Sequence, residues 1–238
     1  MAFQFLCNFR DFGGYAAADG RQVRRGQLYR SDSLGKLRGR DVERLGALGV
    51  RTVIDLRYPW EIASAGRVPD LAGLAYHNCS IEHRPYDQAQ ICACLDPVRF
   101  LADRYAEVLA DGVAEIGEAL RVTAAAGNAP LVIHCASGKD RTGLLAAILL
   151  SLLGVRGGDI AADFALTELA TDRLRADWLA AHPGREMPWP FYGRAPAELI
   201  ELVLAELAAE YGSVREYVTG YLGQPASLID DLRARYLG

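Results

Sequence analysis

The chain has 238 residues, of which 51% are hydrophobic and 24% are charged, a composition typical of globular proteins. Acidic residues outnumber basic ones by 30 to 26, which gives a formal net charge of -4 at pH 7. This balance excludes a general nucleic-acid binder and a protein held on anionic membranes by charge, although it leaves room for a local cationic pocket. We therefore expect no nucleic-acid partner.

Cysteine usage and the N-terminal residues indicate the cellular compartment. The five cysteines are Cys7, Cys79, Cys92, Cys94 and Cys135. An odd number cannot pair fully within one chain, so we read them as free thiols in a reducing compartment. The first residues, MAFQFLCNF, do not resemble a signal peptide, and the longest apolar run, 144–153, is too short to cross a bilayer. We expect a cytoplasmic protein without stable membrane insertion, with export by a route that needs no signal peptide left open.

The first half of the chain alternates strand-like and helix-like segments. A helix is expected over 39–48, where apolar residues recur at helical spacing, and one or two helices over 96–126, with a proline at the first turn. Short β-branched or apolar runs predict strands at 51–56 and 130–134, and a weaker one at 75–81. Strands that alternate with helices favour a parallel sheet.

The C-terminal third is expected to be helical. The segment 142–153 is apolar on nearly all sides and predicts an enclosed central helix. Further helices are expected over 159–169, 171–181, 197–211, 214–222 and 227–236. The segment 182–196 contains four prolines and predicts a loop. No shift in composition marks a second domain, so we expect one α/β domain over 1–238, with a parallel-rich sheet flanked by helices.

The segment HCASGKDRTG, residues 134–143, joins the expected strand to the enclosed helix. A helix N-terminus carries unpaired N–H groups and partial positive charge, so it suits an anion. Cys135 begins this loop, where the helix terminus and Arg141 favour its nucleophilic thiolate. The Arg141 guanidinium can bind two phosphate oxygens at once. The segment therefore predicts phosphoryl transfer through a cysteinyl-phosphate, with no metal and no cofactor.

HCASGKDRTG resembles the signature of the cysteine-dependent protein tyrosine phosphatases. Its ending, GKDRTG, resembles that of a bacterial branch in which some members also hydrolyse phosphoserine, phosphothreonine and phosphoinositides. The segments NFRDFGGY (8–15), LYRSD (28–32), VIDLR (53–57) and YGSV (211–214) are similar to other parts of that branch. The resemblance implies the tyrosine-phosphatase fold and a protein tyrosine phosphatase of broad specificity, with phosphotyrosine as the first-choice substrate.

The resemblance also implies roles for single residues. Cys135 is the expected nucleophile, and Arg141 is expected to bind the phosphate and the transition state. The chain has no Trp-Pro-Asp acid, because the nearest string, MPWP (187–190), lacks the carboxylate. Asp140 inside the loop is therefore the expected general acid, and the reserve candidates are Asp55, Asp87 and Asp96. The loop residues expected to bind substrate are Ala136, Ser137, Gly138, Lys139 and Thr142.

Other residues are expected to support the site. His134 is expected to orient the loop from the strand side. Structural ion pairs beneath the site are expected from Arg10, Asp11, Asp55 and Arg57. Two readings of Lys139 are equally good: a lysine solvated on the loop, or a contact for extra phosphate groups of the substrate. Cys79, Cys92 and Cys94 are read as ordinary thiols, with a reversible disulfide that protects Cys135 as the alternative.

Two alternatives to a tyrosine phosphatase stay open. A phosphoinositide phosphatase would use the same cysteine mechanism, and Lys139 and a wide pocket would favour it. A phosphoprotein-binding pseudophosphatase would be expected to lose Cys135 or Arg141, and both are present. A helical lid within 159–196 is a further hypothesis, because its proline-rich part carries Trp189, Phe191 and Tyr192, which we otherwise read as packing residues. The sequence gives no indication of the oligomeric state.

Overall fold

The computed structural model describes all residues except 1–2, 87–90, 93 and 188. Its described part contains a five-stranded sheet in the order β1-β2-β5-β3-β4. The strands are β1 (Arg10–Asp11), β2 (Leu28–Ser31), β3 (Thr52–Asp55), β4 (Ala75–Asn78) and β5 (Leu131–His134). The short edge strand β1 pairs antiparallel with β2, whereas the pairings β2–β5, β5–β3 and β3–β4 are parallel. The predicted α/β class with a parallel-rich sheet is confirmed.

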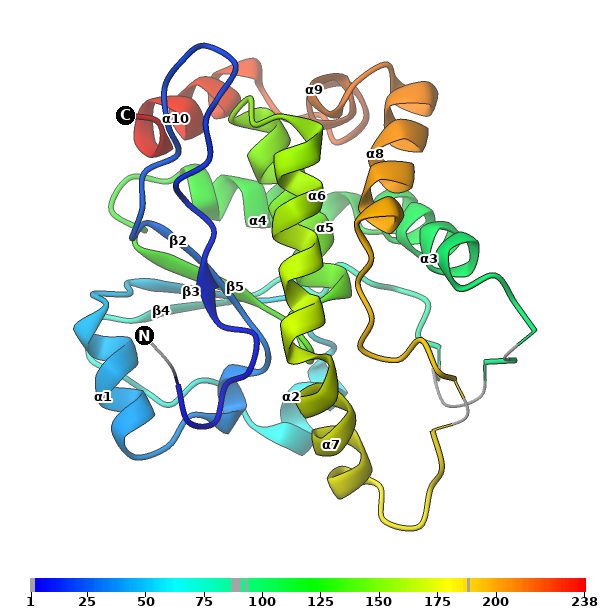
Figure 1. Ribbon diagram of the computed structural model, residues 1–238. Helices are drawn as coiled ribbons and strands as arrows, with labels where there is room; N and C mark the ends of the chain where they lie inside the picture. Colours follow the sequence, from blue (N-terminus) through cyan, green and yellow to red (C-terminus); the bar gives the residue numbers. More distant parts are fainter. Residues whose placement is uncertain (1–2, 87–90, 93, 188) are drawn as a thin grey trace.

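Helices cover both faces of this sheet (Figure 1), with α1 on one side and α4, α5 and α10 on the other. The α-helices of the first half are α1 (Arg40–Ala47), α2 (Pro59–Ala65), α3 (Pro97–Asp111) and α4 (Val113–Ala124). Those of the second half are α5 (Asp140–Leu152), α6 (Gly157–Ala165), α7 (Thr171–Ala181), α8 (Ala197–Tyr211), α9 (Val214–Glu216) and α10 (Ala226–Tyr236). Shorter helical turns are η1 (Leu34–Lys36), η3 (Leu166–Ala170) and the π-helical η4 (Tyr217–Tyr221).

Alternation along the strands divides the apolar residues between two cores. In β5, Leu131 and Ile133 join the larger core, which contains α5, while Val132 faces the smaller core under α1. Ile54 and Val53 of β3 divide in the same way. Because successive side chains of a strand point to opposite faces, a strand buried on both sides must be apolar throughout. This explains why β5 appears in the sequence as an uninterrupted apolar run.

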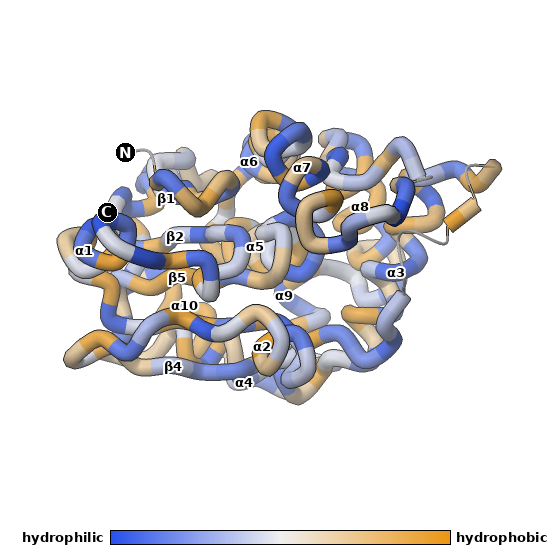
Figure 2. The backbone as a smooth tube through the Cα atoms, turned by 90° about the horizontal axis from the view of Figure 1, so that it is seen from below, coloured by the Kyte–Doolittle hydropathy of each residue, from blue (hydrophilic) through white to orange (hydrophobic). Residues whose placement is uncertain are grey.

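Helix α5 is the central helix that its all-round apolar sequence predicts. Ten of its 13 residues are buried, and it lies between the sheet, α6 and α10. Figure 2 shows a different pattern in the peripheral helices, along which hydrophilic and hydrophobic residues alternate. The two patterns agree with burial, since an enclosed helix has no solvated face. No helix in the described ranges is long and apolar enough to cross a bilayer.

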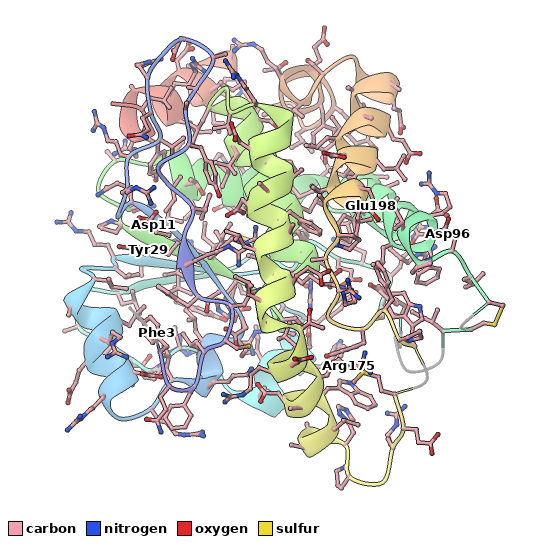
Figure 3. All side chains as sticks on the ribbon, viewed as in Figure 1. Phe3, Asp11, Tyr29, Asp96, Arg175 and Glu198 are labelled. Atoms are coloured by element: carbon pink, nitrogen blue, oxygen red, sulfur yellow. A yellow bond between two sulfur atoms is a disulfide. The ribbon has the colours of Figure 1, made fainter. Side chains whose placement is uncertain are left out.

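Two features differ from the sequence-based expectations. The pattern did not predict the short α2, which begins with Pro59 at its first turn. Cys92 and Cys94 are joined by a disulfide, with their Cα atoms 5.2 Å apart, which corrects the reading of all five cysteines as free thiols. A Cα separation of this size is within the range that a disulfide spans. The bond lies before Asp96, which accepts two backbone N–H bonds at the start of α3 (Figure 3).

Candidate active site

Residues 135–139, which we call the Cys135 loop, connect the central strand β5 to the N-terminus of α5. β5 is paired on both sides, so the loop leaves the middle of the sheet at its carboxyl edge. Gly138 adopts a φ of +67°, and a Cβ atom there would lie 2.4 Å from the carbonyl oxygen of Ser31. Only glycine fits this turn. A loop between a central parallel strand and a helix N-terminus is an anion-binding position.

The side chains of Cys135, at the start of the Cys135 loop, and of Thr142, in the first turn of α5, are buried. Cys135 is 2% exposed and Thr142 is fully buried, and the Thr142 hydroxyl oxygen has no hydrogen-bond partner among the described residues. The backbone N–H groups of 136–139 likewise donate to no acceptor within the described part of the chain. A buried polar group without a partner is costly, so an unused set of donors at one point indicates a ligand site.

Arg141, in the first turn of α5, is bound by two glutamates that sequence reasoning missed. Its two terminal nitrogens lie 2.6 and 3.0 Å from the carboxylate oxygens of Glu61 on α2. Its Nε lies 3.5 Å from Glu82, and its guanidinium lies over the Tyr58 ring. This bidentate pair fixes the plane of the guanidinium. The only signal in the sequence was an acidic residue, Glu61, four positions after Arg57. It could be placed near Arg141 only if α2 had been predicted.

Glu82 has an unusual proton affinity for a carboxyl group. Burial raises its pKa to about 7, with the charge of Arg141 opposing the rise and those of Asp140 and Glu61 adding to it. The Glu82 carboxyl group therefore changes charge near neutral pH. One of its oxygens lies 3.5 Å from Arg141 Nε.

Asp140 and Lys139, the two charged residues between Gly138 and Arg141, contact each other. The Lys139 Nζ lies 3.2 Å from Asp140 Oδ1, and Lys139 is 1% exposed. The Tyr105 hydroxyl donates to the same carboxylate oxygen at 2.8 Å. Burial raises the pKa of Tyr105 well above its ordinary value, so the phenol keeps its proton. The structure thus contradicts the reading of Lys139 as a solvated loop lysine.

Beneath the loop, His134 belongs to a buried charged network. Its Nε2 lies 3.4 Å from Asp55 Oδ2, and Arg57 donates to both oxygens of Asp55 at 2.9 and 2.7 Å. The Tyr76 hydroxyl adds a bond of 2.9 Å to Asp55. Burial lowers the pKa of His134 to about 4, against the opposing charge of Asp55. Although burial acts in the other direction, the Arg57 hydrogen bonds lower the pKa of Asp55.

Of the other predicted residues, some have the expected role and others do not. Arg10 forms an ion pair of 3.3 Å with Asp163 on α6. Asp11, shown on β1 in Figure 3, forms no ion pair with any of the described residues; it accepts the backbone N–H groups of Gly13 and Gly26. The expectation for Asp11 was wrong because an Asx turn in a Gly-rich segment uses the carboxylate locally. The reserve acid Asp96 is used as the cap of α3, and Asp87 lies outside the described residues.

A cavity of about 350 Å³ opens beside the Cys135 loop, at Ala136 and Ser137. Trp60, Trp178 and Tyr192 supply aromatic surface to it. Lys36 and Arg57 also line this cavity. In the described residues, no three His, Cys, Asp or Glu side chains are arranged to hold a metal ion.

The fold and this loop define a class: an α/β protein with a cysteine and an arginine at a strand-to-helix loop whose N–H groups have no acceptor among the described residues. Comparison with known proteins gives the family. The model of the tyrosine phosphatase family matches residues 1–238. A relative assigned to the tyrosine-protein phosphatases in Cupriavidus necator is 31% identical, over 100% of this chain and 88% of its own. The chain therefore belongs to the tyrosine phosphatase family, and it is a cysteine-dependent phosphoric monoester hydrolase.

Two further proteins are similar to this chain. The triple specificity protein phosphatase PtpB of Mycobacterium tuberculosis is 29% identical, over 71% of this chain and 69% of its own. The solved catalytic core of Siw14 superimposes with a TM-score of 0.40 and 17% identity, over 78% of this chain and 87% of that one.

Proposed function

We propose that the chain hydrolyses phosphotyrosine in proteins at the Cys135 loop, in two steps. In the first step the Cys135 thiolate attacks phosphorus, an S–P bond forms, and the P–O bond to the phenol breaks. Asp140 gives its proton to the departing oxygen. In the second step water attacks phosphorus, the S–P bond breaks, and Asp140 takes the proton from the water. Inorganic phosphate leaves, and the thiolate is restored.

One observation carries this proposal: the loop that begins with Cys135 has four backbone N–H groups without an acceptor in the described residues. Donors of this kind stabilise the charge that develops on the equatorial oxygens of a transferring phosphoryl group. Arg141 supplies a permanent cation at the same end of the site, held in plane by Glu61. The unpartnered Thr142 hydroxyl is suited to donate to the thiolate when it leaves phosphorus.

The cavity beside the loop supports an aryl phosphate as the substrate. Trp60, Trp178 and Tyr192 offer ring surfaces for a phenyl group and the peptide around it. This agrees with the names of the two relatives, which are a tyrosine-protein phosphatase and a triple specificity protein phosphatase. We also propose a cytoplasmic location, which the free thiols of Cys7, Cys79 and Cys135 support.

A phosphoinositide is the second candidate substrate, because Lys36 and Arg57 line the same cavity. Both cations already have carboxylate partners: Lys36 bridges Asp32 and Asp177, and Arg57 pairs with Asp55. Lys139, on which the phosphoinositide reading first rested, is buried against Asp140. The balance of these contacts favours phosphotyrosine.

Release of phosphate from three substrates tests the proposal. A phosphotyrosine peptide, a phosphoserine peptide and a phosphoinositide are compared in the presence of a chelator, with wild type beside Cys135→Ser. We expect the highest kcat/KM for phosphotyrosine and loss of about 10⁴-fold or more in the variant. Turnover retained by Cys135→Ser would overturn the mechanism, and preference for the phosphoinositide would overturn the substrate. Cys7→Ser is the matched control, because Cys7 lies beside Asp32 and outside the loop.

A further inference from the structure

Two consecutive carbonyl groups of the Cys135 loop accept hydrogen bonds from side chains far away in the sequence. Asn8 Nδ2 donates to the carbonyl oxygen of Ser137 at 2.9 Å. Arg30 Nη2 donates to the carbonyl oxygen of Gly138, also at 2.9 Å. Asn8 is 4% exposed and Arg30 is 1% exposed. Both bonds are therefore shielded from water. Loss of either bond would leave a buried polar group without a partner, which costs free energy.

The neighbouring carbonyls of the loop are occupied as well. The backbone N–H of Ser33 donates to Ala136 at 3.0 Å. At the other end, the N–H of Gly143 in α5 donates to Lys139 at 2.7 Å. Every carbonyl from residue 136 to residue 139 thus accepts a bond from the surrounding protein.

These outward bonds determine where the amide groups of the loop point. In a trans peptide unit, the C=O bond of one residue and the N–H bond of the next lie in one plane and point in opposite directions. Holding the Ser137 and Gly138 carbonyls toward Asn8 and Arg30 turns the next two N–H groups the other way. Those N–H groups belong to Gly138 and Lys139, and they have no acceptor among the described residues.

Arg30 is itself held by a carboxylate on α6. Its Nη1 lies 2.6 Å from Asp163 Oδ2, and both side chains are almost fully buried, at 1% and 2% exposure. Arg10 binds the other oxygen of Asp163 and also donates to Asn8 Oδ1. One buried network therefore connects Asp163 with both donors to the loop. The two arginines lower the pKa of Asp163, although burial alone would raise it, so the carboxylate stays charged.

We propose that Asn8 and Arg30, with Asp163 behind Arg30, are positioning residues that aim the amide groups of the Cys135 loop at the oxyanion. None of the three touches substrate. The inference rests on the proposed function, because the proposed reaction uses the orientation of these amide groups and the inference explains what fixes that orientation. It also gives a physical purpose to the NFRD and LYRSD segments, which lie outside the loop in the sequence.

The affinity for an oxyanion distinguishes a role in positioning the loop amides from a role in stabilising the folded protein. Tungstate binding, kcat and KM for p-nitrophenyl phosphate, and the melting temperature are measured for wild type, Asn8→Ala, Arg30→Lys and Asp163→Asn. We expect tungstate to bind about tenfold more weakly to each variant, with a matching fall in kcat, as for loss of one hydrogen bond to or from a charged group. Asp163→Glu, which keeps the charge, should recover part of the affinity.

Asp41→Asn is the control for buried-network damage, because Asp41 is 2% exposed and binds the N–H groups of Gln4 and Phe5 far from the loop. It should lower the melting temperature and leave tungstate affinity unchanged. Folded Asn8→Ala and Asp163→Asn with wild-type affinity and kcat would overturn the proposal. If Arg30→Lys fails to fold, these two variants decide alone. Wild type that binds no tungstate and hydrolyses nothing would instead refute the proposed function itself.

As a second test, Arg30→Lys and Asp163→Asn are combined. Since Asp163 holds Arg30 directly and reaches Asn8 only through Arg10, the double variant should lose less tungstate affinity than the sum of the two single losses, whereas independent sites would give additive losses. Additive losses would contradict the order of action proposed here.

Discussion

The Cys135 loop and the α7 side of the cavity face the same space, but they are held in different ways. The loop carbonyls from 136 to 139 are all hydrogen-bonded, and Cys135, Lys139 and Thr142 are buried. Helix α7 is joined to η1 through the half-exposed pair Lys36–Asp177, and it follows Leu169, which is 87% exposed. Segments with few buried contacts open at low free-energy cost. The loop is therefore held by buried hydrogen bonds, whereas the contact between α7 and η1 is a partly exposed ion pair.

The largest expected effect comes from the proposed general acid Asp140, the first residue of α5 after the Cys135 loop. Asp140→Asn cannot give a proton to the leaving oxygen. It should lower kcat by about 10²- to 10⁴-fold for alkyl phosphates and far less for p-nitrophenyl phosphate, whose leaving group needs no proton. The control is Asp103→Asn, an exposed change on α3. Equal losses on both substrates would move the acid to another residue.

A smaller loss is expected when the guanidinium loses its orienting partner. Glu61→Gln removes the carboxylate that binds both terminal nitrogens of Arg141. We expect kcat/KM to fall about 10- to 100-fold, because the bidentate geometry that presents the cation to phosphate is weakened. The matched control is Glu115→Gln, which changes a partly exposed glutamate on α4. An unchanged kcat/KM in Glu61→Gln would show that Arg141 needs no partner.

The pH dependence should reveal Glu82. With its pKa raised to about 7, Glu82 is neutral below that pH and negative above it, close to a dianionic substrate. Wild-type kcat/KM should therefore fall by an extra few-fold as the pH rises through 7, since like charges disfavour binding. Glu82→Gln should remove that fall and leave the rest of the profile in place. A profile that is identical in the two proteins would contradict the assignment.

The smallest effect tests the α7 side. Asp177→Asn breaks the ion pair with Lys36, which is partly exposed and worth about 1 kcal/mol or less. We expect KM for a phosphotyrosine peptide to change about threefold, with kcat for p-nitrophenyl phosphate unchanged, in line with the hypothesis of a helical lid within 159–196. A large loss of kcat on the small substrate would show that α7 belongs to the rigid side.

Much of this account follows from the sequence, and the omissions have physical reasons. The apolar runs before and after the loop predicted β5 and α5, because burial on all sides demands such sequences. The bounds of α7 and α8 also agree with their predicted ranges. The short α2 was missed because seven residues carry too little periodicity, and Glu61 was missed with it.

The supporting contacts of the loop were harder to predict. Asn8 and Arg30 reach Ser137 and Gly138 across more than 100 positions in the chain. Local patterns cannot specify such pairs, since they form only when β1, β2 and β5 come together in the sheet. The ion pairs of Arg10 and Arg57 were foreseen as a group, but the partner of Arg10, Asp163, lies on a helix that its own periodicity assigns to packing.

The most direct test of the central claim is to trap the covalent intermediate. Asp140→Asn enzyme and wild type are mixed with a ³²P-labelled phosphotyrosine peptide, quenched within milliseconds, and digested for peptide mapping. The account predicts acid-labile phosphate on the peptide that contains Cys135, formed at the rate of the first step and absent from Cys135→Ser. Full turnover with no labelled peptide at any quench time, or label on another residue, would contradict it.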